Sequence, residues 1–184
     1  YAVFDRAFIY DSYSCRLDKG THKAVERLQQ FMRQVSKNYT ASCWALKCDI
    51  KKFFASVDHT ILLDLLRKRI PNQDIVRVLA EVIDSFSVLP EKGIPLGNLT
   101  SQVFANIYMN QLDYYVKEQL KIKHYIRYAD DFVILSENKI WLEKQIGPIK
   151  NFLFNKLKLE LHANKVFIKT LSSGIDFLGW VHFT

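Results

Sequence analysis

Apolar and polar residues follow two different periods along this chain, and the period indicates which segments form helices and which form strands. Apolar residues recur at helical spacing in five segments. These predict helices over residues 21–37, 58–70, 72–84, 101–120 and 140–155. Pro71 separates the second from the third. Asp58 is expected to cap its helix, because its carboxylate can accept a hydrogen bond from a free amide of the first turn.

Short runs rich in β-branched and aromatic residues predict strands between these helices. Such runs cover residues 42–49, 124–127 and 132–135. Alternating leucines over residues 157–161 predict a further strand, and residues 177–183 predict another. Because helices segregate from a mainly antiparallel sheet in this order of elements, the sequence predicts an α+β fold.

Carboxylates stand at the ends of these predicted strands. Asp130 and Asp131 form the turn between two strands, and Asp49 ends an apolar one. Like charges held this close repel and tend to keep a proton. A divalent cation removes that cost, and hard oxygen ligands suit magnesium. For the Asp130–Asp131 pair alone, an ordinary surface turn is the alternative interpretation, since Asp is common in turns.

Five motifs stand in order along nearly the whole chain. They occupy residues 47–54, 93–102, 128–131, 159–165 and 177–180. Together they resemble motifs A to E in the palm of a reverse transcriptase. The resemblance implies a right-hand polymerase palm, with a mainly antiparallel sheet, packed helices and part of the fingers, and with the thumb absent from this chain.

The same resemblance implies a single reverse transcriptase domain over residues 1–184. About residues 1–40 would form a portion of the fingers and about residues 41–184 the palm. A fingers-like segment near residues 70–95 would be inserted into the palm.

One motif separates lineages within the superfamily. Group II intron and retroviral enzymes have Gln before the motif B glycine and Pro after its serine, whereas this chain has Leu96 before Gly97 and Gln102 after Ser101. This arrangement is similar to the bacterial reverse transcriptases of diversity-generating retroelements, as is the fingers motif over residues 10–22. The resemblance implies error-prone synthesis of cDNA from RNA in the cytoplasm of a bacterium, encoded by the bacterium or a phage.

The resemblance also assigns roles in nucleotidyl transfer. Two Mg²⁺ ions, for which Mn²⁺ could substitute, would be bridged by Asp49 and Asp130. Asp131 would be a peripheral ligand, and the Ile50 carbonyl would contact the nucleotide-bound ion. Lys165 matches a lysine that protonates pyrophosphate, although an exposed lysine at this position could equally be solvated.

A second set of residues is expected to bind the incoming nucleotide. Phe54, five residues after Asp49, matches the steric gate against the ribose 2′-hydroxyl. A core aromatic is the alternative interpretation, and Phe53 is the better candidate for that role. Further expected contacts to the nucleotide come from Arg16, Lys19, Leu96 and Gly97. For Arg16 and Lys19, simple solvation is the alternative.

Charge and composition agree with nucleic-acid partners. The 184 residues carry a net charge of +7, and grouped Lys and Arg side chains often bind phosphate backbones. We expect an RNA template, a DNA or RNA primer, deoxynucleoside triphosphates and, as a possible partner, an accessory protein subunit. No membrane partner is expected, because no apolar run is long enough to span a bilayer. Three cysteines without Cys-x-x-Cys spacing indicate a reducing compartment.

Two other functions remain open at the level of sequence. One is a reverse transcriptase of another lineage, either group II intron-like or a bacterial defence enzyme. The other is a non-catalytic nucleic-acid-binding module of polymerase fold. The intact set of Asp49, Asp130 and Asp131 argues against loss of catalysis.

Overall fold

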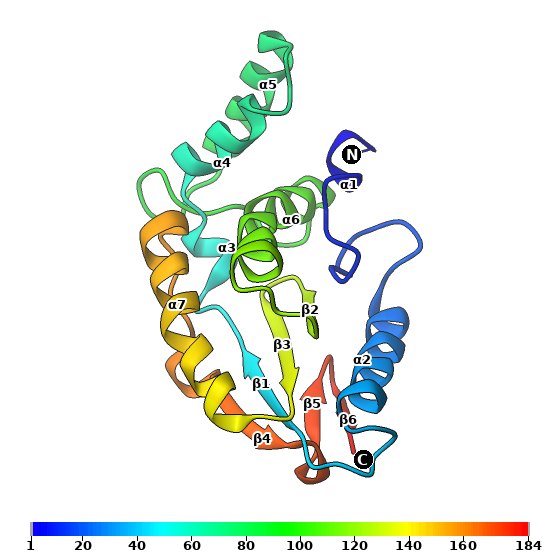
Figure 1. The fold of residues 1–184 in the computed structure, drawn as a ribbon. Coiled ribbons are helices and arrows are strands. Elements are labelled where there is room, and N and C mark those ends of the chain that lie inside the picture. The colour runs from blue at the N-terminus through cyan, green and yellow to red at the C-terminus, as the bar shows by residue number, and fades with distance from the viewer. Residues whose placement is uncertain (1, 184) are drawn as a thin grey trace.

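A computed structural model describes residues 2–183 (Figure 1). Its α-helices are α1 (Ala2–Asp5), α2 (Thr21–Val35), α3 (Phe53–Ser56), α4 (His59–Arg67), α5 (Gln73–Asp84), α6 (Leu99–Tyr114) and α7 (Lys139–Leu157). A π-helical turn, Tyr115–Gln119, continues α6, and two 3₁₀ turns cover Ala163–Lys165 and Leu171–Ser173. The predicted helices are therefore present. Asp58 caps α4 as predicted, because its carboxylate accepts a hydrogen bond from the Ile61 amide at 3.1 Å.

The strands form one central sheet and one separate hairpin. The sheet contains β1 (Trp44–Cys48), β2 (Tyr125–Tyr128), β3 (Asp131–Ser136) and β4 (Phe167–Thr170), in the antiparallel order β2-β3-β1-β4. The hairpin pairs β5 (Ile175–Phe177) with β6 (Trp180–His182). The structure thus confirms the α+β fold with an antiparallel sheet.

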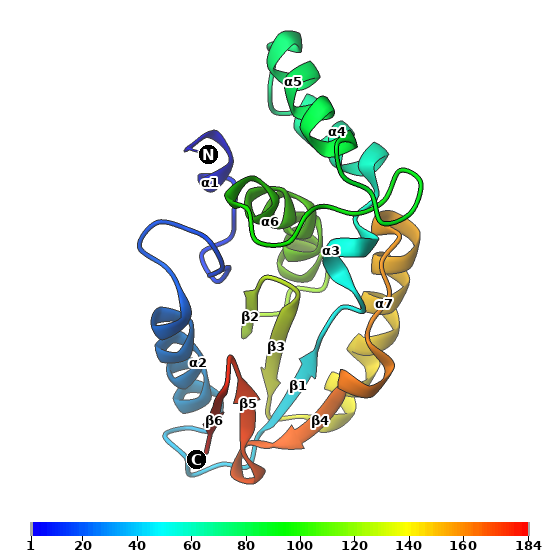
Figure 2. The same cartoon turned by 180° about the vertical axis from the view of Figure 1, so that it is seen from behind.

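Each face of the sheet has its own apolar core, because successive residues of a strand point to opposite faces. Leu46 of β1 and Ile134 of β3 pack with residues of α6 and α7. Ala45 and Val133, one position earlier in each strand, pack with residues of α2 and the β5–β6 hairpin. Figures 1 and 2 show α7 along one side of the sheet and α2 on the other.

Helices α4 and α5 extend away from the sheet, and α5 forms the far end of the molecule (Figures 1 and 2). Only Val76 and Ile83 of α5 are buried, whereas Ile75 and Val78 are at least half exposed. Of the two helices, α5 lies within the segment near residues 70–95 for which a fingers-like role is predicted. In the part of the chain that the structure describes, no helix combines the length and apolar character needed to cross a membrane.

Two predicted strands were wrong. Leu157 is the last residue of α7, and Lys158 ends that helix in the left-handed region with φ 53°. Of the expected strand, only Leu161 makes a β-bridge, to Ile50. The segment 177–183 is part of two strands rather than one, because the chain reverses between β5 and β6. The reversal is formed by Leu178 and Gly179, two consecutive residues with positive φ angles.

Candidate active site

Strand register brings the three predicted carboxylates to one end of the central sheet. The last pair between β1 and β3 is Cys48 with Phe132, so the residue that follows β1 lies opposite the first residue of β3. Those two positions are Asp49 and Asp131. Asp130 lies at the tip of the β2–β3 turn, which Ala129 enters with φ 54°. Two chain segments some 80 residues apart therefore place their acids together.

Burial and the neighbouring carboxylates disfavour the charged form of Asp130 and Asp131. The pKa of Asp131 is raised to about 6, chiefly by burial, with further contributions from Asp49 and Asp130 and an opposing one from Lys47. The pKa of Asp130 is also raised, again chiefly by burial and then by Asp49. Excess negative charge at this end of the sheet is the condition under which a bound cation is most favourable.

Two lysines compensate the carboxylates. The Lys47 ammonium lies 3.1 Å from Asp131 Oδ2, and it also donates a hydrogen bond to the Asp176 carbonyl at 2.7 Å. Lys165 Nζ lies 3.0 Å from Asp49 Oδ2, and this contact raises the pKa of Lys165. Lys47 is largely buried, whereas the Lys165 side chain is 55% exposed and free to rotate away.

The donor chemistry of the site fits a divalent cation. Asp131 Oδ1 is buried and accepts no hydrogen bond within the described residues. Carboxylate oxygens are the ligands that Mg²⁺ prefers. With the side chains as they lie in residues 2–183, no three acidic, His or Cys groups are grouped tightly enough to hold a metal ion. Binding a cation would therefore require Lys165 to release Asp49 and the carboxylates to turn toward a common point.

A buried ion pair stabilises the β2–β3 turn that carries Asp130. Arg127 is fully buried and donates to both oxygens of Asp113 at 2.7 and 2.6 Å. It also donates to the Ala129 carbonyl at 2.9 Å and to Ser12 Oγ at 2.9 Å. Tyr125 completes the network by donating to Asp113 at 2.7 Å. Arg127 therefore ties the Asp130 turn to α6 and to the N-terminal segment.

The network around Arg127 was not predicted from the sequence. The available signals were an arginine inside the apolar run before the Asp pair and an acid that is the only charged residue of α6. The contact between Lys47 and Asp131 was also not predicted. Its side chain meets Asp131 only because of the β1–β3 register, which the sequence does not reveal.

The predicted nucleotide-binding residues lie in several different places. Phe54 is half-buried in α3, 5.4 Å from the ring of Phe53. Phe53 is 2% exposed, which confirms it as the core aromatic of the pair. Leu96 is 77% exposed in the loop before α6, and Gly97 has φ 91° with open space where a Cβ would lie. The roles of Phe54, Leu96 and Gly97 in nucleotide binding stay predictions.

Arg16 and Lys19 hold the N-terminal segment in this structure. The largely buried Arg16 guanidinium donates to Asp5 Oδ1 at 2.8 Å and to the carbonyls of Ile9 and Ser12 at 2.7 and 2.9 Å. Lys19 donates to the Tyr10 carbonyl at 2.9 Å and lies 3.5 Å from the centre of that ring. Contact with a triphosphate would require both side chains to exchange these partners.

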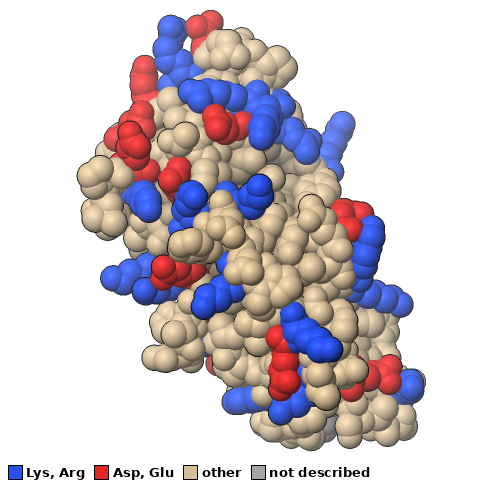
Figure 3. All heavy atoms as spheres, turned by 60° about the vertical axis from the view of Figure 1, so that its left-hand side comes forward, with Lys and Arg blue, Asp and Glu red and all other residues tan. Residues whose placement is uncertain are grey.

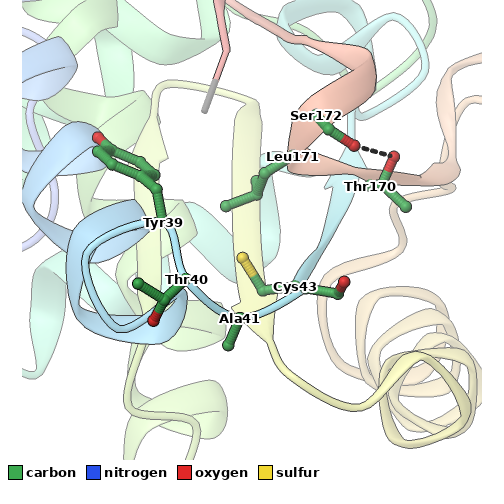
Figure 4. A pocket seen from close by; sticks show the side chains of 8 residues that line it. Tyr39, Thr40, Ala41, Cys43, Thr170, Leu171 and Ser172 are labelled. Carbon is green, nitrogen blue, oxygen red and sulfur yellow. Dashed lines mark hydrogen bonds between the residues drawn. The ribbon is translucent and has the colours of Figure 1, made fainter.

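One cavity lies away from the carboxylates (Figure 4). It has a volume of about 210 Å³ and is lined by residues 39–43 and 170–172. These residues precede β1 and follow β4, so the cavity is at the opposite end of β1 from Asp49. In Figure 4, Ser172 donates to Thr170 at 3.2 Å. The lining contains no Asp, Glu, Lys, Arg or His, and the cavity therefore lacks the charged groups that phosphoryl transfer needs.

Comparison with known proteins decides the family. A family model described as reverse transcriptase (RNA-dependent DNA polymerase) matches residues 2–182. The chain belongs to the reverse transcriptase family. The family motifs quoted from the sequence therefore identified it correctly, and the carboxylate cluster is the candidate active site of a reverse transcriptase palm.

Curated relatives of this reverse transcriptase chain are distant. Protein YkfC of Escherichia coli (strain K12) is 24% identical over 215 residues, covering 96% of this chain and 56% of YkfC. Group II intron-encoded protein LtrA of Lactococcus lactis subsp. cremoris is 22% identical over 251 residues, covering 97% of this chain and 40% of LtrA. The chain thus spans about half the length, or less, of these relatives.

Solved structures agree on the fold. Apo telomerase from Candida tropicalis matches 98% of this chain and 37% of its own chain, with a TM-score of 0.71 and 13% identity. Telomerase from the same organism in complex with a TWJ fragment of telomeric RNA matches 92% and 32%, with a TM-score of 0.69 and 15% identity. At these identities the likeness concerns the palm fold alone.

Proposed function

We propose that this chain carries the catalytic centre of an RNA-directed DNA polymerase, which extends a primer by template-dependent nucleotidyl transfer. The observation that carries the proposal is the convergence of Asp49, Asp130 and Asp131 at one end of the sheet. Their mutual repulsion and the unpartnered Asp131 oxygen are the features expected of a cation site.

The residues divide the work of the reaction. Asp49 and Asp130 would hold both cations, while Asp131 and the Ile50 carbonyl would each contact one. When bound, two Mg²⁺ or Mn²⁺ ions would activate the primer 3′-hydroxyl and neutralise charge on the leaving pyrophosphate. Lys165, displaced from Asp49, would carry an ammonium proton close to that leaving group.

RNA and nucleotide partners follow from the same proposal. The net charge of +7 favours a nucleic-acid phosphate backbone. A telomerase of similar fold is described in complex with telomeric RNA, which supports an RNA partner here. We propose an RNA template, a DNA or RNA primer and deoxynucleoside triphosphates as ligands, and an accessory subunit as a further partner.

Primer extension tests this function directly. The purified chain is given a labelled DNA primer annealed to an RNA template, the four deoxynucleotides and Mg²⁺, with EDTA in a parallel reaction. Extension that requires the template and is abolished by EDTA supports the proposal. Tight binding of primer–template without any extension would favour the non-catalytic binding module instead.

Within the family we propose a lineage of error-prone enzymes similar to those of diversity-generating retroelements. The support is Leu96, which offers only apolar contact where relatives have a polar Gln beside the nucleotide. A site that lacks a specific polar contact discriminates less between correct and incorrect partners. A group II intron-like enzyme is the second candidate, and the similarity to LtrA favours it.

The lineage is tested by sequencing cDNA made by the parent chain and by the Leu96→Gln variant. The retroelement proposal expects a high error rate in the parent, concentrated at template adenines, and fewer errors in the variant. Equal error spectra would remove Leu96 from the mechanism. A low error rate in the parent would support the group II-like alternative.

A further inference from the structure

Four lysines line one small cavity formed in part by the residues that follow Asp49. The cavity has a volume of about 220 Å³ and is lined by Lys51, Lys52, Ala55, Ser56, Leu89, Lys92, Lys158 and Glu160. With four lysines and one glutamate, its lining has a formal charge of +3. We call this the lysine pocket. None of its lysines has a place in the proposed reaction.

Three separate segments bring these lysines together. Lys52 precedes α3 in the left-handed region with φ 46°, and Lys158 ends α7 with φ 53°. Lys92 is held by β-bridges to Asp58 and Leu89 in the turn before motif B. Left-handed backbone is unfavourable for residues that carry a Cβ, so the surrounding fold must hold Lys52 and Lys158 where they are.

The positive charge of the pocket is poorly compensated. Glu160 pairs with Lys51 at 3.3 Å, and both side chains are more than half exposed. Across residues 2–183, Lys52, Lys92 and Lys158 form no ion pair with an acidic side chain. Figure 3 shows Lys and Arg side chains grouped on the side of the molecule that carries α4 and α7. The lysine pocket is distinguished by four lysines that line a single cavity.

Uncompensated ammonium groups around one cavity repel, and an anion that enters removes this cost. Phosphate oxygens are strong acceptors for several ammonium donors at once. A space of about 220 Å³ suits a compact anion of several charges, whereas the phosphates of a nucleic-acid strand are spread along its length. The chemistry of the lining therefore selects a polyphosphate group.

We propose that the lysine pocket is a binding site for pyrophosphate or for the polyphosphate tail of a nucleotide. Its lining belongs to the backbone segments that are paired beside Asp49. The Lys51 amide donates to the Glu160 carbonyl at 2.9 Å, and the His162 amide donates to the Asp49 carbonyl at 2.8 Å. The same two paired segments therefore frame Asp49 and the pocket. That the pocket receives pyrophosphate released by polymerisation rests on the proposed function, but the binding itself does not.

Calorimetric titration of the full chain with inorganic pyrophosphate tests the site. EDTA in the buffer keeps divalent cations from the carboxylates, so the result is independent of catalysis. The pocket variant is Lys52→Gln/Lys158→Gln. The matched control is Lys68→Gln/Lys144→Gln, which removes two exposed lysines outside the pocket. Circular dichroism confirms that both variants fold.

The proposal expects the wild-type chain and the control to bind pyrophosphate alike, and the pocket variant to bind about tenfold more weakly. Equal weakening in both variants would mean a general charge effect and would overturn it, as would absence of binding by the wild type. An RNA oligonucleotide without terminal phosphates distinguishes the phosphate source. If the pocket variant loses affinity for this RNA but not for pyrophosphate, the pocket follows a strand backbone and the proposal fails.

Discussion

At the scale of single residues, the candidate active site combines acids that repel one another with lysines that hold them in place. Lys165 reaches Asp49 from the surface, and Lys47 reaches Asp131 from within β1. The two contacts differ in exposure, so they differ in how easily a cation could displace them. Asp49 is the more available ligand, and Asp131 is tied more firmly to the protein.

Removing the charge of one bridging ligand should abolish synthesis. Asp49→Asn and Asp130→Asn change little in volume but remove a carboxylate that the cations need. Each variant should lower primer extension by at least about a hundredfold while its thermal unfolding stays cooperative. Asp131→Asn should be milder, because Asp131 is the peripheral ligand. Near-normal extension by Asp130→Asn would contradict the proposed site.

The raised pKa of Asp131 predicts a pH dependence of stability in metal-free buffer. The folded state favours the protonated acid, so this contribution is fully present below about pH 4 and is lost as pH rises through about 6. The free energy of unfolding of the wild type, relative to Asp131→Asn, should fall by up to about 3 kcal/mol across this window. Urea unfolding at each pH measures it. A difference that stays constant with pH would mean that Asp131 titrates in the ordinary range.

Phe54 is predicted to exclude ribonucleotides. Its ring is half-buried beside Phe53, so part of it faces outward from α3. Phe54→Val shortens this side chain and should raise incorporation of ribonucleotides relative to deoxyribonucleotides by about tenfold or more. Competition between the two nucleotide types in primer extension gives the ratio. If the ratio does not change, Phe54 is only a packing residue.

At the scale of secondary-structure elements, buried pairs hold the active-site turn in register. Arg127 of β2 and Asp113 of α6 have no exposed side-chain surface. Breaking one partner of such a pair leaves an uncompensated charge in the interior, which is far more costly than the pair itself. The position of the turn that carries Asp130 thus depends on the packing of α6 against β2.

Arg127→Met should therefore destabilise the chain by about 3–5 kcal/mol in urea unfolding. Arg77→Met offers a matched control, because Arg77 pairs with Asp74 at 2.9 Å on the exposed surface of α5. Its cost should be below about 1 kcal/mol. The double variant Arg127→Met/Asp113→Leu removes both charges and should recover much of the lost stability. Equal costs for the two single variants would contradict the role of the buried pair.

The elements also show what the sequence could predict. Helical periodicity located α2, α4, α5, α6 and α7, and the acids at strand ends located the candidate site. Three alternating leucines are too few to distinguish a strand from the end of a helix, and α7 continues through Leu157. The strand Phe167–Thr170 was missed because it lies at the sheet edge with no fully buried residue. Contacts such as Lys47 with Asp131 depend on register, which local sequence does not encode.

At the scale of the whole molecule, excess positive charge predicts how the affinity for nucleic acid depends on salt. With a net charge of +7, binding to a primer–template should release counterions from the phosphate backbone. The affinity should fall about a hundredfold between 50 and 200 mM salt, as expected for a protein that neutralises about four phosphates. Fluorescence anisotropy of a labelled duplex gives the slope. A flat titration would mean that the basic groups face solvent or another protein.

The central position of β1 has a consequence for the order in which the chain can fold. Both hydrogen-bonding edges of β1 are occupied by strands that come later in the sequence, β3 and β4. During synthesis on the ribosome, β1 remains unpaired in the sheet until more than 80 further residues have emerged. Unpaired apolar strands are prone to join other chains. A chain that stops before Phe167 would leave one edge of β1 open and should aggregate, even though Asp49, Asp130 and Asp131 are all present.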